Sequence, residues 1–321
     1  MSYERYGAGC DRSHLQEAAL RAVQRLTGAA EGRTFVARCG ERMAGAACWG
    51  RLTWDSELFG FPAARLHFLL ASAPGLEGQI VQAALCETLL DDARHSGIRH
   101  LTARVDAGDL GTIQVLEASG FRLLDGLQTF SLALRGAGFS PPGALAPLPT
   151  GRAEPRPQPK RLPHGLVRGF QTEDLDPVCA IARSVYVLDR FHADTALAPG
   201  VADRLHETWV RNSCLGQAAD HVVIAETNGL VAGFVTCKLD QEATAVLGGP
   251  LGTIVLVATA AAARGQGVAR AATRGALDWF GGQGAALVEV GTQLRNIPAG
   301  RLYESCGFRL LGVSLTLRRI L

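Results

Sequence analysis

Apolar and polar residues follow one another along this chain as short strand-like runs that alternate with longer helix-like runs. The spacing predicts helices over 14–26, 79–93, 110–119, 175–186, 201–213, 267–280 and 297–306. Strands are predicted over 34–39, 45–49, 65–70, 100–105, 128–134, 166–170, 221–226, 231–240, 252–259 and 287–292, with two last strands from 308 onward. Strands alternating with helices predict a mixed α/β sheet.

Two stretches of the sequence can be laid on each other. IQVLEASGF at 113–121 aligns with GRLYESCGF at 300–308, each at the end of a predicted helix. Between the two copies, residues 136–163 hold eight of the 14 prolines. Proline removes a backbone donor and fixes φ, so this stretch is expected to be a semi-extended linker. The sequence therefore predicts a first domain at 1–135, a proline-rich linker at 136–163 and a second domain at 164–321.

Composition narrows the function. The 321 residues are 47 % hydrophobic and 19 % charged, with a net charge of +2, which indicates no surface for nucleic acid or an anionic membrane. The uncharged stretch at 243–263 has Gly248-Gly249-Pro250 in its middle, which would break a membrane-spanning helix. The first residues lack the apolar run of a signal peptide. Eight scattered cysteines without zinc spacing favour reduced thiols, no metal site and a cytoplasmic protein.

A glycine-rich turn is the first candidate for chemistry. The apolar strand over 252–259 leads into Arg264-Gly265-Gln266-Gly267-Val268-Ala269, where the next helix begins. Glycines let a ligand approach the backbone, and the first amides of a helix have no internal partners and carry the positive end of its dipole. This arrangement suits a pyrophosphate, although it is neither a Walker loop nor the dinucleotide-binding fingerprint.

The turn and the segment after it resemble the GNAT superfamily of acyl-CoA-dependent N-acyltransferases. Arg264, Gly267 and Ala269 match motif A of that family, and Asn296, Ala299, Tyr303 and Gly307-Phe308 match the spacing of its following helix. The resemblance implies a catalytic GNAT domain at 164–321, a degenerate GNAT-like domain at 1–135 and acetyl-CoA as co-substrate. It implies that the coenzyme is bound by Val257, Ala258, Thr259, Arg264, Gly265, Gln266, Gly267, Val268, Ala269 and Asn296.

Tyr303 is the candidate general acid. It lies seven residues after Asn296, about two helical turns and roughly 10 Å along one face, so a coenzyme could meet both side chains. A tyrosine with a pKa of about 10 stays protonated at neutral pH and can protonate a departing thiolate. A tyrosine packed against the sheet is the plain structural alternative. The strand at 252–259 carries no base for the amine, so Glu289 on the next strand is the candidate, or the proton leaves through water.

A narrower resemblance concerns the acceptor. The stretch from Leu52 to Gly60 (LTWDSELFG) is similar to a signature of the TDP-fucosamine acetyltransferases, which acetylate the amine of TDP-4-amino-4,6-dideoxy-galactose. Arg190, His192 and Asp194 lie in a segment that shares this resemblance and are expected to shape the acceptor pocket, although solvated loop residues are the alternative.

These observations favour an acetyl-CoA-dependent N-acetyltransferase whose partner is a nucleotide-linked amino sugar. A related enzyme would acetylate an aminoglycoside-type antibiotic, a polyamine or a protein N-terminus. A non-catalytic acyl-CoA sensor is the alternative from another class, and Tyr303 speaks against it. A homodimer is possible, and the sequence does not decide the oligomeric state. In the first domain, Leu116 aligns with Tyr303 and Asp109 with Asn296, so that domain is expected to bind no coenzyme. Its expected part is to pack on the second domain, with Trp54 and Phe59 as contacts.

Overall fold

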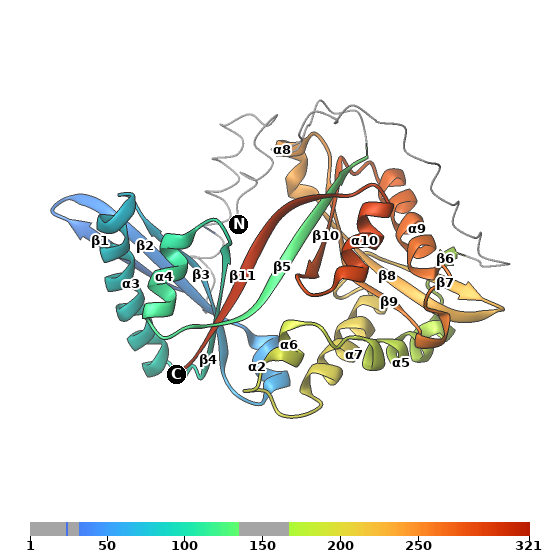
Figure 1. Cartoon of the computed structure of the whole chain (residues 1–321), viewed down its shortest axis with the longest axis horizontal. Coiled ribbons are helices and arrows are strands. Elements are labelled where there is room, and N and C mark those ends of the chain that lie inside the picture. Colours follow the sequence, from blue (N-terminus) through green and yellow to red (C-terminus); the bar gives the residue numbers. More distant parts are fainter. Residues whose placement is uncertain (1–23, 25–31, 135–166) are drawn as a thin grey trace.

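The computed structural model describes residue 24, residues 32–134 and residues 167–321 of the chain (Figure 1). The proline-rich linker expected at 136–163 lies outside the described residues, as does the expected helix at 14–26 apart from Gln24. Residues 32–134 are called the first half below, and residues 167–321 the second half. Among the described helices, none is long and apolar enough to cross a membrane.

The strands of the described residues form one mixed sheet. In chain order they are β1 Gly32–Cys39, β2 Arg42–Arg51, β3 Ala63–Ala71, β4 His100–Asp106, β5 Arg122–Ala133, β6 Val167–Gly169, β7 His221–Thr227, β8 Leu230–Asp240, β9 Leu251–Thr259, β10 Leu287–Gln293 and β11 Arg309–Ile320. Their order across the sheet is β1-β2-β3-β4-β11-β5-β10-β9-β8-β7-β6. Only β3–β4 and β9–β10 are parallel pairs, one in each half. The predicted mixed α/β sheet is therefore confirmed.

The two halves exchange their long strands at the centre of this sheet. β5 of the first half pairs with β10 of the second, and β11 of the second half pairs with β4 of the first. β5 and β11 also pair with each other, antiparallel, and run side by side through the middle of the molecule (Figure 1). The sheet is thus continuous across both halves.

The expectation of two last strands after residue 308 is wrong. One strand, β11, runs from Arg309 to Ile320. A register shift pairs Leu310 with Phe130 and Gly312 with Thr129, so Leu311 is the extra residue of a bulge and the chain does not turn there. The neighbouring place that a second strand would take is filled by β5. For the same reason β5 begins at Arg122 and is longer than predicted, because both of its edges are paired.

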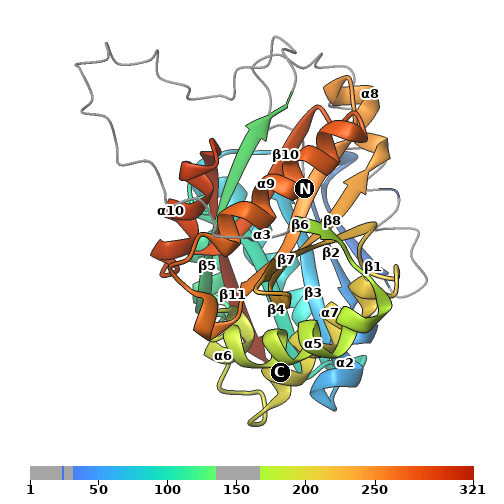
Figure 2. The same ribbon diagram turned by 90° about the vertical axis from the view of Figure 1, so that its right-hand side faces the viewer.

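Helices cover both faces of the sheet. They are α2 Thr53–Phe59, α3 Gly75–His95, α4 Leu110–Ala118, α5 Leu175–Val185, α6 Arg190–Ala193, α7 Val201–Cys214, α8 Thr244–Leu247, α9 Val268–Gly282 and α10 Ile297–Ser305. On β7, Val222 and Ile224 pack with α5 and α7, whereas Val223 and Ala225 pack with α9. Because alternate residues of a strand point to opposite faces, α9 lies on the face opposite to α5 and α7 (Figure 2).

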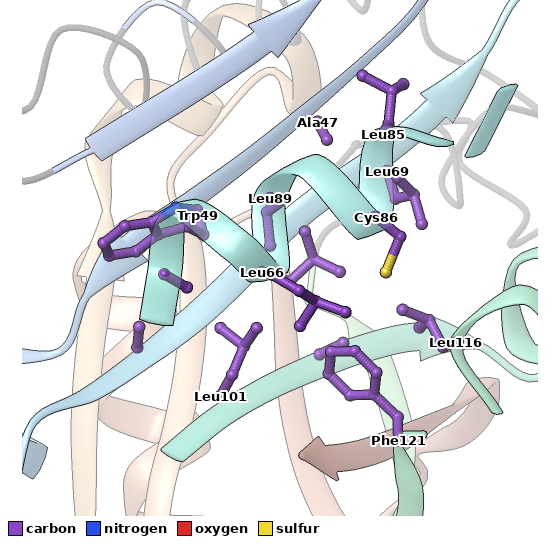
Figure 3. Close-up of a cluster of buried hydrophobic side chains, with 14 of the residues drawn as sticks. Ala47, Trp49, Leu66, Leu69, Leu85, Cys86, Leu89, Leu101, Leu116 and Phe121 are labelled. Atoms are coloured by element: carbon purple, nitrogen blue, oxygen red, sulfur yellow. The ribbon is translucent and has the colours of Figure 1, made fainter. Parts of the chain in front are cut away.

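The first half has a core of its own between its strands and α3 and α4. Leu89, Leu101 and Phe121 in this core are inaccessible to solvent (Figure 3). A separate cluster joins the halves: Phe59 packs on Phe191, with ring centroids 6.2 Å apart, beside Leu205. Trp54 and Trp209 meet edge to face with centroids 6.1 Å apart in the same cluster. The expected packing role of Trp54 and Phe59 is confirmed.

The duplication proposed from the sequence recurs in backbone detail. Asp109 caps α4 by accepting a hydrogen bond from the Thr112 amide (3.1 Å), and Asn296 caps α10 by accepting one from the Ala299 amide (3.3 Å). Each helix is followed by a glycine with positive φ, at 82° and 100°, and then by a phenylalanine. Those two phenylalanine amides donate to the carbonyls of Leu116 and Tyr303, at 3.0 and 3.1 Å. The two halves are copies of one substructure.

Candidate active site

The site begins where β9 and β10 separate. These parallel strands pair only from Leu251↔Leu287 to Ile254↔Val290, whereas β9 continues to Thr259 and stays paired with β8. The Ala260 amide donates to Ala232 on the β8 side (2.8 Å). Because backbone groups alternate between the two edges of a strand, those of Val257 and Thr259 face the gap. The gap offers unpaired backbone donors and acceptors to an extended ligand.

The glycine-rich turn lies at the end of this gap. Gly265 (φ 75°) and Gly267 (φ 85°) both adopt the left-handed conformation that favours glycine, and a Cβ at either position would meet no atom within 4 Å. Gly267 precedes α9, whose first turn has no side-chain cap. The first amides of α9 are therefore open to an anionic ligand.

A cavity of about 1610 Å³ extends from this turn to the junction of the two halves. It is lined by ten residues predicted from the sequence to hold the coenzyme: Val257, Ala258, Thr259, Arg264, Gly265, Gln266, Gly267, Val268, Ala269 and Asn296. The first half contributes Arg65, Arg104, Asp125 and Leu127 to the same cavity. The volume exceeds that of an ordinary single-ligand pocket of roughly 300–1,000 Å³, so two substrates can meet in it.

Tyr303 lines the cavity from α10. Its side chain is buried, and its ring contacts Phe130 of β5 and Phe308, with centroids 5.9 and 6.0 Å away. Burial raises the pKa of the Tyr303 hydroxyl above its usual value, so the hydroxyl is protonated at every physiological pH. The geometry brings together the turn, Asn296 and a protonated phenol, as the sequence predicts.

Glu289 lies at the edge of this arrangement. It is buried on β10, in register with Thr253 of β9 and Ser131 of β5, before the two parallel strands separate. Thr253 lines the cavity, whereas Glu289 is not among the lining residues of the described chain. Its role as a base stays a prediction.

Of the three expected acceptor residues, Arg190 lines the cavity, whereas His192 and Asp194 lie outside its described lining. Asp194 is buried and accepts hydrogen bonds from His100 (2.7 Å) and Arg318 (2.6 Å). Burial alone would raise the pKa of Asp194, but the bond with His100 and the charge of Arg318 lower it below its usual value. Asp194 thus joins β4, β11 and α6, which is a structural role.

His192 belongs to a second polar cluster. Asp189 caps α6 through the amides of Phe191 and His192, and its other oxygen lies 2.5 Å from His192 Nδ1. His206 lies 3.8 Å from Asp189, and burial lowers the pKa of its imidazole. Asp189, His192 and His206 bring potential metal-ligating atoms within 4.8 Å of one another. The sequence predicts no metal here, and the contacts within the cluster already satisfy the Asp189 carboxylate.

In the equivalent gap of the first half, a side chain of the protein bonds to the backbone. There β3 and β4 pair only from Ala63↔His100 to Leu66↔Ala103, so Leu69 corresponds to Val257, three residues beyond the last pair. Gln82 of α3 donates to the Leu69 carbonyl (3.0 Å) and to Thr112 Oγ1 (2.8 Å). This side chain takes up the backbone group that is open in the second half, and the absence of coenzyme binding in the first copy stays a prediction.

Comparisons with known proteins agree with this geometry. Residues 188–308 match the acetyltransferase (GNAT) family. The spore coat polysaccharide biosynthesis protein SpsD of Bacillus subtilis (strain 168) is 30 % identical over 135 residues, which are 42 % of this chain and 44 % of that protein. The match thus spans less than half the length of this curated relative.

Two solved structures share the whole fold. A tandem GNAT protein from the clavulanic acid biosynthesis pathway superposes with a TM-score of 0.51 and 16 % identity, covering 90 % of this chain and 82 % of that one. A GCN5-related N-acetyltransferase from Sphaerobacter thermophilus superposes with a TM-score of 0.57 and 16 % identity, covering 98 % of this chain and 90 % of that one. Residues 188–308 are therefore similar to the acetyltransferase (GNAT) family, and the fold of the described residues is similar to that of a tandem GNAT protein.

Proposed function

We propose that this chain is an acetyl-CoA-dependent N-acetyltransferase whose acceptor is the amine of a nucleotide-linked amino sugar. The observation that carries the proposal is the gap between β9 and β10, which opens beside the uncapped start of α9 and leads to Tyr303 in one cavity. The gap suits the extended, amide-containing arm of coenzyme A, and the start of α9 suits its pyrophosphate.

Chemistry in this cavity would consist of one acyl transfer. The acceptor nitrogen attacks the thioester carbon, a C–N bond forms, and the C–S bond breaks. Tyr303 donates its proton to the departing sulfur, which suits a hydroxyl kept protonated by burial. The proton lost by the amine goes to Glu289 or to water. Residues 264–269 and Asn296 would position the coenzyme and take no proton.

The acceptor class is supported by two likenesses. SpsD is named for polysaccharide biosynthesis, and the stretch from Leu52 to Gly60 is similar to a signature of TDP-fucosamine acetyltransferases. In the fold this stretch forms α2 and packs on α7, beside Arg190. A sugar carried by a nucleoside diphosphate fits a cavity with room for a second ligand.

The test is a substrate panel. The purified full chain is incubated with acetyl-CoA and one amine at a time: TDP-4-amino-4,6-dideoxyhexoses, other nucleotide amino sugars, a polyamine, an aminoglycoside and an N-terminal peptide. Thiol release and the acetylated product are followed. We expect turnover with a nucleotide amino sugar. Turnover only with a cationic amine would refute the acceptor class, and tight acetyl-CoA binding without turnover on any amine would favour a sensor.

A further inference from the structure

Three arginines from separate elements line the cavity near the junction of the two halves. They are Arg65 of β3, Arg104 of β4 and Arg190 of α6. Arg65 is in register with Thr102, and Arg104 lies two residues after Thr102, so both arginines project from the same face of adjacent strands. Arg190 approaches from the second half.

These guanidinium groups have few negative partners. Arg190 has Asp55 of α2 at 3.7 Å, and Arg104 donates to Thr316 Oγ1 at 3.4 Å. Within the described ranges 32–134 and 167–321, neither Arg65 nor Arg104 has a carboxylate within ion-pair distance. Desolvation, followed by the positive charge of Arg65, lowers the pKa of Arg104 and of Arg190 to about 10, although the Arg104 side chain stays exposed where it lines the cavity. A shift of this kind marks cations that gain from an added anion.

Two acidic residues line the same region and offset the charge only in part. Asp189 is already engaged by His192 and by the backbone amides of α6. Burial raises the pKa of the Asp125 carboxyl and so disfavours its ionised form, although the positive charge of Arg104 acts in the opposite direction. The arginine cluster therefore remains short of negative charge.

We infer that Arg65, Arg104 and Arg190 bind the phosphates of the acceptor, and that the acceptor is a nucleoside diphosphate derivative. Guanidinium groups match phosphate oxygens with paired donors, and three of them suit a ligand with more than one negative charge. This inference rests on the proposed acetyl transfer. It also counts against cationic acceptors, which this end of the cavity would repel.

The position separates this anion site from that of the coenzyme. β4 lies four strand positions from β9 in the sheet, which is roughly 19 Å at about 4.8 Å per strand. The start of α9 follows β9, so a pyrophosphate held there is distant from Arg104. The first half, where Gln82 bonds the Leu69 carbonyl in the equivalent gap, would thus contribute two of the three groups that recognise the acceptor.

The experiment measures binding without turnover. Thymidine diphosphate and, separately, inorganic pyrophosphate are titrated calorimetrically into the full chain and into Arg65→Ala, Arg104→Ala and Arg190→Ala. We expect each variant to bind thymidine diphosphate about 10- to 100-fold more weakly, as for a lost charge-assisted hydrogen bond, with acetyl-CoA affinity unchanged. Arg104→Lys keeps the positive charge but loses the paired donors of the guanidinium, so its affinity for thymidine diphosphate should lie between those of the wild type and Arg104→Ala. Arg42→Ala, exposed at the start of β2 and outside the cavity lining, is the matched control and should bind normally.

Each outcome of these titrations either supports or overturns the inference that the three arginines bind the acceptor's phosphates. Failure of the wild-type chain to bind thymidine diphosphate, or equal affinity in the wild type and all three alanine variants, would overturn the inference. Loss of acetyl-CoA affinity in the variants instead would mean that the arginines serve the coenzyme, which also overturns it. Arginine-dependent binding of the diphosphate in a chain that acetylates no amine would support the anion site and refute the proposed acetyl transfer, so the two can fail separately.

Discussion

Removing one oxygen atom from Tyr303 is the sharpest test of the mechanism. In Tyr303→Phe the ring keeps its contacts with Phe130 and Phe308, and no hydrogen bond of the hydroxyl to the described residues is lost. The free energy of unfolding should therefore change by less than about 1 kcal/mol. General acid catalysis contributes roughly 10²–10⁴-fold, so kcat should fall by that factor, or about 2.7–5.4 kcal/mol in activation free energy.

The split between binding and turnover is part of this prediction. A proton donated to the departing sulfur acts in the transition state, so acetyl-CoA affinity should stay within a few-fold while kcat falls. Thiol release measured with a chromogenic reagent gives kcat, and calorimetry gives the affinity. Because the pKa of Tyr303 is raised above its usual value of 10, the wild-type rate should not decline up to pH 9 through loss of this proton.

Tyr186→Phe is the matched control. Tyr186 also lines the cavity, and its buried hydroxyl has no partner among the described residues. Its ring stacks on His206, 4.4 Å between centroids, and this contact survives the substitution. We expect kcat within about threefold of wild type. Near-normal turnover in Tyr303→Phe, or an equal loss in Tyr186→Phe, would refute the assignment of the acid.

Three further substitutions probe the turn, the ion pairs and the base. Gly267→Val should abolish acetyl-CoA binding, measured by calorimetry. Gly284→Val is the control: its φ is similarly positive and its surroundings are equally open, but it lies outside the cavity lining, so it carries only the backbone strain of about 1–2 kcal/mol. Equal acetyl-CoA affinities of the two variants would place the coenzyme elsewhere. Hydrogen bonds from Arg168 (2.6 Å) lower the pKa of the Asp174 carboxyl, so its stabilisation is present above the ordinary value of 3.8 and is lost as the pH falls through the lowered pKa. Asp174→Asn should therefore lower the free energy of unfolding by about 1–3 kcal/mol at pH 7 and by progressively less as the pH falls through the lowered pKa. A constant difference in denaturant titrations would contradict this. Glu289→Gln should lower kcat at least tenfold if the carboxylate takes the proton, and unchanged kcat across pH 6–9 would leave the proton to water.

Local sequence patterns predicted the two repeated substructures but not the strand pairing that joins them. The Gly-Phe repeat and the Asn296 to Tyr303 spacing are short-range signals, and both recur in the structure. The pairing of β5 with β10 has no local signal, because either edge of a strand can pair with any partner of suitable register. The four-residue helix α6 was missed because so short a run carries no helical periodicity.

The arginines of the first half were also missed, although a signal exists. Arg65 interrupts a strand of mainly apolar residues, AARLHFLLA, and Arg104 follows directly after the buried residues of HLTARVD. A charged residue within such a strand usually has a specific partner or faces a cavity, but the sequence does not say which cavity. That answer depends on α6, which follows them in the chain and packs beside β5.

The strand exchange makes the two halves one folding unit. Arg104 and Thr316 are hydrogen-bonded although they are 212 positions apart, so β4 keeps an open edge until β11 has been synthesised. During synthesis the first half exposes an unpaired strand edge that could associate with other chains. Such long-range pairing also slows folding, because a large loop must close before the sheet is complete.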